Sequence, residues 1–186
     1  MIFKNVDIPG VFEITPINHH DHRGSLIRNF DSHIFNKRGH KIEWAQQIHS
    51  YTEKKNTIRG LHVQMAPEPE CKLISVFQGQ LFWVYVDLRT NSKTFGEWGS
   101  IILHSGSPQC LLVPPQFAHG CLSLTDNVHA IILADNHYYE ALGYGILWKD
   151  EELAIDWPLN HRCPLIISDE HNRYASFNKF RKSILL

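Results

Sequence analysis

The chain has 186 residues, of which 43% are hydrophobic and 20% are charged, and its formal net charge at pH 7 is −1. This length and composition predict one globular domain over residues 1–186 with a sizeable hydrophobic core. The near-neutral charge and the scattered basic residues argue against a nucleic-acid partner. No apolar run approaches the roughly 20 residues that span a bilayer, so we expect no membrane partner.

The cysteines and the N-terminal residues indicate a compartment. None of the four cysteines forms a CxxC pair, so neither a zinc ribbon nor a redox motif is predicted. The first residues lack the apolar core of a signal peptide. We therefore expect reduced thiols and a cytoplasmic location.

The predicted elements are short. In chain order, the first is a helix over residues 31–37, with Asp31 or Ser32 as its cap. Runs rich in Val, Ile, Phe, Trp and Tyr then predict strands over residues 73–77, 81–88, 99–103, 110–113 and 129–133. Turns are predicted at residues 78–79 and 150–154. Short strands at this spacing predict an all-β fold. A double-stranded β-helix fits, which is a cupin-like jelly roll with short peripheral helices and small molecules bound between its sheets.

Residues 59–64 contain the most informative histidine. Side chains alternate along a strand, so Gly60, His62 and Gln64 are expected to share one face, and Arg59, Leu61 and Val63 the other. A polar set on one face indicates either a pocket lining or a hydrogen-bonded structural histidine. An imidazole can take and return a proton near neutral pH, which favours catalysis if the face lines a pocket.

Four other polar residues could each be either structural or functional. His119 stands beside Gly120 in an expected turn, and is either structural or part of the same pocket. The ammonium of Lys72 either reaches solvent or stabilises an oxyanion in a pocket. Arg23 and Arg59 either are ordinary charged residues or clamp phosphate oxygens, which suit the guanidinium fork.

The sequence does not predict a metal site. His62-x-Gln64 and Pro114-x-x-x-x-His119 are similar to the metal-binding motifs of cupins. Gln64 stands where those motifs need a second histidine, and a neutral amide is a poor ligand for zinc or iron. We therefore expect no metal and no other cofactor.

Over nearly its whole length the chain resembles the nucleotide-sugar 3,5-epimerase family, typified by dTDP-4-dehydrorhamnose 3,5-epimerase. The matching segments, in order, are Asp21-x-Arg23-Gly24, Gln46 to Ser50, Arg59 to His62 with Gln64, Lys72-Leu73, Val86 to Arg89, Ser92-x-Thr94-Phe95-Gly96-x-Trp98, Val113-Pro114, Phe117 to Gly120, Trp148-x-Asp150, and Ile155-x-Trp157-Pro158. The resemblance implies a metal-free jelly roll, usually a homodimer. It also implies action on a nucleoside diphosphate 4-keto-6-deoxy sugar in deoxysugar or surface-polysaccharide biosynthesis.

The resemblance also implies residue roles. His62 would be the general base that removes a hydrogen from C3 or C5 of the sugar, and Lys72 would hold the enolate oxygen. The residue that orients His62 aligns with Asp169, Glu170 or His171, with Asp169 as the first choice. The substrate would be bound by Arg23, Gln46, Arg59, His119 and Tyr138, with the two arginines on the diphosphate.

Several pocket positions depart from the family pattern. Ile132 stands where the family has the tyrosine that serves as acid, Trp83 where it has an aspartate, and Ile48 where it has an asparagine. His19 and Arg28 replace an aromatic and an acidic residue near the nucleotide base. These departures predict inversion at a single carbon, with water or another group such as Tyr138 supplying the proton, and they leave the base open. The alternatives are a non-catalytic sugar-nucleotide-binding protein on the same fold and a metal-dependent cupin enzyme.

Overall fold

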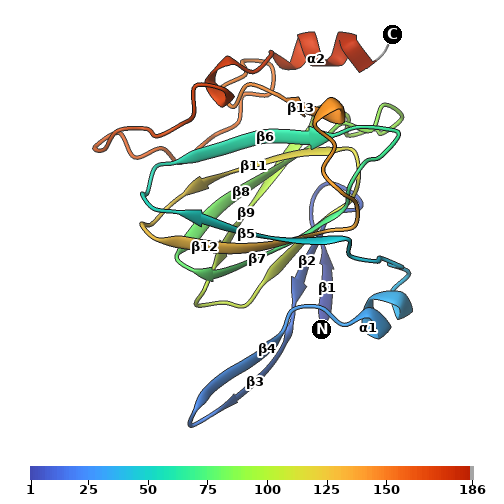
Figure 1. The fold of residues 1–186 in the computed structure, drawn as a ribbon, viewed down its shortest axis with the longest axis vertical. Helices are drawn as coiled ribbons and strands as arrows, with labels where there is room; N and C mark the ends of the chain where they lie inside the picture. The colour runs from blue at the N-terminus through green and yellow to red at the C-terminus, as the bar shows by residue number, and fades with distance from the viewer. Residues whose placement is uncertain (185–186) are drawn as a thin grey trace.

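The computed structural model describes residues 1–184 as two antiparallel β-sheets packed face to face (Figure 1). The six-stranded sheet has the order β1 (Ile2–Asn5), β2 (Phe12–Thr15), β10 (Cys110–Val113), β7 (Lys72–Gln78), β12 (Val128–Ala134), β5 (Gln46–Thr52). The five-stranded sheet has the order β13 (Gly143–Gly145), β6 (Ile58–Gln64), β11 (Phe117–Ser123), β8 (Gln80–Asp87), β9 (Trp98–His104). This is a cupin-like jelly roll, and the expected fold class is confirmed.

Smaller elements lie around the two sheets. They are the hairpin of β3 (Ile17–Asp21) and β4 (Gly24–Arg28), the helices α1 (Ser32–Lys37) and α2 (Phe177–Ile184), and the 3₁₀ turns η1 (Glu140–Leu142) and η2 (His171–Arg173). The β3–β4 hairpin projects away from the sheets at the bottom of Figure 1, whereas α2 lies beyond β6 at the top. No helix within residues 1–184 is long and apolar enough to cross a membrane.

The strands expected from apolar runs are confirmed as β7, β8, β9, β10 and β12, and β10 has the predicted bounds. The expected helix is α1, and the carboxylate of Asp31 caps it by accepting from the backbone N–H groups of His33 and Ile34. The strands β1, β3, β4 and β5 carried no apolar signal, because most of their residues are exposed. The strand β2 was also missed, although Ile14 is buried and only Thr15 is exposed. The helix α2 was also missed, since it is short and buries only Phe177 and Phe180.

Three apolar clusters hold the sheets in place. Between the sheets, Ile74 and Val76 of β7 pack with Trp83 and Tyr85 of β8. The C-terminal segment covers the outer face of the five-stranded sheet and includes Trp148, Trp157 and Phe180, while α1 buries Phe35 against the six-stranded sheet; these clusters also contain Leu61, Val63, Ile14, Leu73 and Leu112. Each side chain of this size stabilises the fold by roughly 1.5–3 kcal/mol when fully buried.

The two central strands approach unusually closely at two glycines. Gly60 on β6 has a φ of +103°, and a Cβ atom there would lie 2.7 Å from both the Cα of Gly120 and the carbonyl oxygen of His119. The register of β6 and β11 shifts just beyond this point, between His119 and Cys121. His62 and His119 are direct partners across the strands, so this contact sets the position of both imidazoles.

Replacing Gly60 with Ala is expected to destabilise the fold. The added methyl group meets backbone atoms that cannot rotate away, in a conformation that side chains rarely adopt. We expect the free energy of unfolding to fall by on the order of 2–5 kcal/mol in chemical denaturation. The matched control is Gly39→Ala, since Gly39 also has a positive φ (+87°) but an added methyl group there would meet no atom within 4 Å. Equal losses in the two variants would mean that the close approach adds nothing.

Candidate active site

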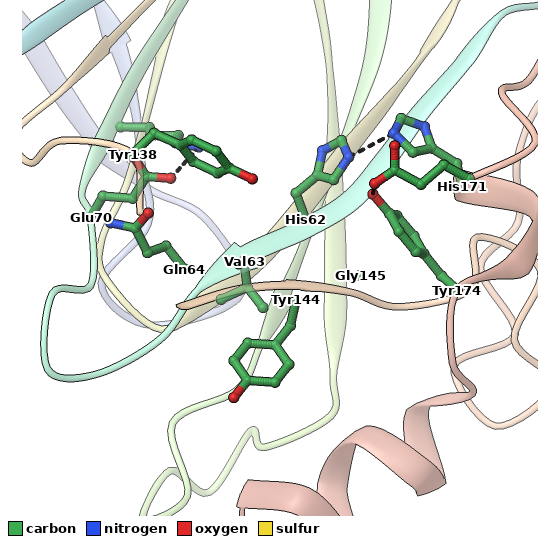
Figure 2. A pocket seen from close by; sticks show the side chains of 12 residues that line it. His62, Val63, Gln64, Glu70, Tyr138, Tyr144, Gly145, His171 and Tyr174 are labelled. Atoms are coloured by element: carbon green, nitrogen blue, oxygen red, sulfur yellow. Dashed lines mark hydrogen bonds and ion pairs between the residues drawn. The ribbon is translucent and has the colours of Figure 1, made fainter. Parts of the chain in front are cut away.

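An open cavity of about 350 Å³ lies between β6, the start of β7, β13 and the η2 turn (Figure 2). Strand alternation explains its composition, because Leu61 and Val84 pack under the C-terminal segment while His62 turns to the other face. The lining residues are His62, Val63, Gln64, Glu70, Lys72, Tyr138, Gly143, Tyr144, Gly145, Glu170, His171 and Tyr174. Of the eight residues expected to form the site, the cavity therefore contains His62, Lys72 and Tyr138.

A second histidine contacts His62. The Nε2 atoms of His62 and His171 are 2.9 Å apart, and the two rings meet edge to face at 73°. The backbone N–H of Gly60 points at the Nδ1 of His171 over 3.4 Å. Asp169 was expected at this place, but it contributes its carbonyl oxygen to the η2 turn, where it accepts from the Nε of Arg173. The structure therefore corrects this expectation, and His171 is the residue that touches His62.

Burial disfavours the charged form of both imidazoles. It lowers the pKa of His62 to about 4, with smaller electrostatic contributions from His171, Lys72 and Arg59. Burial also lowers the pKa of His171, against the attraction of the neighbouring Glu170 carboxylate. A neutral His62 has a lone pair available to accept a proton.

An ion pair lies on the facing wall of the cavity. The Nζ of Lys72 is 2.6 Å from the Oε1 of Glu70, and the two side chains are only 13% and 8% exposed. Glu70 was not predicted as a site residue, although its i−2 position relative to Lys72 is a signal that could have found it. The pair holds an ammonium group at a defined place in a partly desolvated pocket, where a charge acts strongly.

Two glutamines position the segment that carries Tyr138. The amide nitrogen of Gln64 donates to the carbonyl oxygens of Glu68 and His137, and its oxygen accepts from the N–H of Tyr139. The amide nitrogen of Gln46 donates to the carbonyl of Asn136, so Gln46 supports this segment. The hydroxyl of Tyr138 points toward His62 from the side opposite His171 (Figure 2).

His119 lies behind the cavity. It is 8% exposed, and its ring stacks on the indole of Trp83 at 5.6 Å and 15°. Burial holds the pKa of His119 well below its ordinary value, with further lowering by Lys72 and His62. The expected turn at this position is wrong, because Gly120 lets β11 continue past β6 as a strand. The Nε1 of Trp83 is buried without a hydrogen-bond partner among the described residues.

The two arginines lie in different places. Arg59 was expected to share a face with Leu61, but its guanidinium donates to the Thr52 hydroxyl and the Tyr51 carbonyl on β5 of the other sheet. The register shift beside Gly60 accounts for this, since it interrupts the alternation of β6. Arg23 lies on the projecting hairpin, ion-paired to Asp21 at 2.6 Å. Within a single chain, the guanidinium groups of Arg23 and Arg59 therefore do not lie together.

Tyr174 is a further lining residue that the sequence did not indicate. Its hydroxyl donates to the Oε1 of Glu170 at 3.1 Å, and its ring lies edge-on to His62 with centroids 5.8 Å apart. Burial raises its pKa, and Glu170 adds to this. The ring packs directly on Gly145, where any side chain would overlap it. Tyr174 and Glu170 thus form a wall behind the two histidines.

The arrangement suits proton transfer beside a carbonyl group. It combines an uncharged imidazole, a buried ammonium group that can stabilise an oxyanion, and a phenol on the facing side. Within residues 1–184, no group of three or more His, Cys, Asp or Glu side chains is placed to hold a metal ion.

The model of the family described as dTDP-4-dehydrorhamnose 3,5-epimerase matches residues 5–179. The enzyme of that name from Shigella flexneri is 34% identical over 167 residues, which cover 89% of this chain and 91% of the relative. The Mycobacterium tuberculosis epimerase structure superimposes with a TM-score of 0.93 at 34% identity, covering 100% of this chain and 93% of that one. The Legionella pneumophila 3,5-epimerase, solved in complex with dTDP-4-keto-L-rhamnose, has a TM-score of 0.90 at 29% identity, covering 95% and 93%.

The titration of His62 checks the electrostatics of this site. Because its pKa is lowered to about 4, the ring is expected to stay neutral from pH 8 to well below 6.5, the ordinary value. Between pH 6.5 and pH 4 this histidine binds a proton in the unfolded chain but not in the folded chain. The free energy of unfolding should therefore decrease as the pH falls from 6.5 toward 4. Nitrogen-15 NMR of the imidazoles measures the midpoint, with His62→Gln assigning the signal. A midpoint at or above 6.5 would contradict the description of the site.

Proposed function

Because the chain belongs to the dTDP-4-dehydrorhamnose 3,5-epimerase family, and is thus a nucleotide-sugar epimerase of deoxysugar biosynthesis, we propose that this pocket inverts a carbon of a nucleoside diphosphate 4-keto-6-deoxy sugar. The observation that carries this assignment is the presence of neutral His62 and the Lys72 ammonium group on facing walls of one cavity. The relatives do not favour the two alternatives, a non-catalytic binding protein and a metal-dependent cupin enzyme.

The proposed reaction is a proton abstraction followed by a proton return. The 4-keto group acidifies the hydrogens on C3 and C5, and His62 takes one of them as general base. The electron pair of the broken C–H bond moves into an enolate, whose oxygen is stabilised by the ammonium of Lys72. The carbon then receives a proton on its other face, and His62 gives its proton to solvent. Glu70 supports this role because it holds Lys72 in place.

The proton donor differs from the family pattern. Ile132 stands at the tyrosine position of the family pattern, and its cross-strand partners are Ile48 on β5 and Ile74 on β7, so none of these three side chains has a proton to give. We propose that Tyr138 or a water molecule returns the proton, since the Tyr138 hydroxyl points across the cavity toward His62 (Figure 2). With the usual donor absent, we propose inversion at one carbon, either C3 or C5.

We also propose that the protein is a homodimer. The β3–β4 hairpin projects from the sheets with Leu26 73% exposed, and an isolated two-stranded hairpin is only marginally stable. The outer face of the six-stranded sheet exposes Tyr51 and Phe77 beside a pair of histidines, His49 and His129. A second copy would cover this apolar area. It would also offer a way to bring one copy's hairpin to the other copy's pocket, as a diphosphate site shared by Arg23 and Arg59 requires.

Solvent exchange tests the reaction. We expect incubation with 4-keto-6-deoxy nucleotide sugars of several bases in deuterated water to remove the C3 or C5 proton signal in NMR. His62→Ala should abolish this exchange, because the base is lost. Lys72→Ala should lower it by on the order of 100-fold, as for the loss of an oxyanion donor. His161→Ala, in an exposed loop, is the control and should leave it unchanged.

Full exchange by His62→Ala would show that another group is the base. Binding of the sugars without exchange in the unaltered protein would instead support the non-catalytic alternative. Loss of exchange on treatment with a chelator would support the metal-dependent one.

The oligomeric state is tested by light scattering on a size-exclusion column. The expected mass is twice the 21.6 kDa of one chain. Phe77→Glu places a charge on the exposed apolar face and should shift the protein toward the single-chain mass, because a buried unpaired charge opposes association. A single-chain mass for the unaltered protein at tens of micromolar would rule out the stable homodimer.

A further inference from the structure

We propose that His171 is the positioning residue of the catalytic base, acting as an uncharged hydrogen-bond partner where the family pattern places a carboxylate. The proposal rests on the proposed role of His62 as base. It would make the base of this protein a pair of imidazoles, with one proton shared between two Nε2 atoms 2.9 Å apart.

The backbone of the η2 turn delivers His171 to this position. The N–H of His171 donates to the hydroxyl of Ser168, and the Nε of Arg173 donates to the carbonyl of Asp169, which closes the turn. The neighbouring acidic side chain of Glu170 is directed elsewhere, since it accepts from the Tyr174 hydroxyl. The ring of Tyr174 packs against both imidazoles, which limits their rotation.

The hydrogen bonds of His171 suit a partner that can both donate and accept. The Gly60 N–H approaches the Nδ1 of His171, which favours a proton on Nε2 and donation to His62. Donation from His171 leaves the single proton of neutral His62 on its Nδ1. His62 can therefore take a proton from the sugar only in its other tautomer, in which its Nε2–H donates to the Nε2 of His171, its Nδ1 lone pair is free, and His171 carries its own proton on Nδ1. The Gly60 contact is 3.4 Å long and weak, so the change of tautomer costs little. A carboxylate can only accept.

The charges around His62 show the effect of having His171, and not a carboxylate, beside the base. The groups that act on its charge are His171 from η2, Lys72 from β7 and Arg59 from β6, and each disfavours the protonated ring. His119 on β11 lies directly opposite and supplies no negative charge. The acidic groups of the cavity are already engaged, because Glu70 pairs with Lys72 and Glu170 bonds to Tyr174. His62 therefore forms its imidazolium without an adjacent negative charge.

The decisive variant is His171→Asp, which restores a carboxylate at this position. A negative charge beside His62 favours its protonated form, so the acid limb of the exchange–pH profile should move up by about 1 unit or more. Exchange at pH 8 should be unchanged or higher, because the base becomes stronger.

His171→Asn keeps a polar group without charge, and should leave the acid limb of the exchange–pH profile within about half a unit of its position in the unaltered protein. His171→Ala should lower kcat by on the order of 10-fold or more with little change in KM, because only the orientation of the base is lost.

The control is His161→Asp, which makes the same change in the exposed loop and should leave the limb unmoved. Thermal melts establish that each variant is folded. If His171→Asp does not fold, the kcat and KM of His171→Asn and His171→Ala decide, and full exchange in both would overturn the role of His171.

Imidazole NMR without substrate separates this proposal from the proposed function. His171→Asp should raise the His62 titration midpoint by about 1 unit or more whether or not any sugar is turned over. A raised midpoint in a protein that exchanges no substrate hydrogen would overturn the epimerase assignment and, with it, the catalytic role of His171. An unmoved midpoint and an unmoved acid limb in a protein that does exchange would overturn the role of His171 alone.

Discussion

The close approach of β6 and β11 at Gly60 and Gly120 is the contact on which the site depends. A side chain on either glycine would overlap the backbone of the facing strand. This contact places His62 opposite His119 and lets the Gly60 N–H face His171. The register shift beside it also turns Arg59 toward the other sheet. A single backbone contact therefore sets the position of His62 and of the groups directly beside it on β6 and β11.

The polar groups at the cavity sit against an apolar interior. Trp83 fills the space between the sheets and stacks on His119, while Ile48, Ile74 and Ile132 lie side by side across three strands. Burial in these surroundings keeps His62 neutral, because a charged imidazole would lose its hydration. The Lys72 ammonium remains in the pocket with its own carboxylate partner. The site thus separates a neutral imidazole from an ammonium group, the two groups to which we assign the proposed proton abstraction and enolate stabilisation.

The agreement between sequence and structure differs from element to element for physical reasons. Strands that are largely buried on both faces give short continuous apolar runs, and β7, β8 and β10 were predicted for that reason. The β3–β4 hairpin is exposed along its length, so its residues give no such signal. That His62 lies on the opposite face of β6 from Leu61 followed from strand alternation. The direction of Arg59 did not, since a register shift interrupts the alternation.

The sequence by itself indicated the jelly-roll fold through short apolar runs, and it indicated the family through motifs in a fixed order. The resemblance to that family also pointed to His62, Lys72 and Tyr138, which line one cavity. Only the tertiary structure decided which residue of the Asp169–His171 stretch touches His62. Neighbouring residues in a 3₁₀ turn point in different directions, and a contact 109 residues distant in sequence depends on how that turn docks on β6. Glu70 lies two residues before Lys72 and their pairing could have been found from the sequence, whereas the same reason hid the stacking of Trp83 on His119. Such contacts depend on side-chain directions and strand register, which appear only when the sheets are packed.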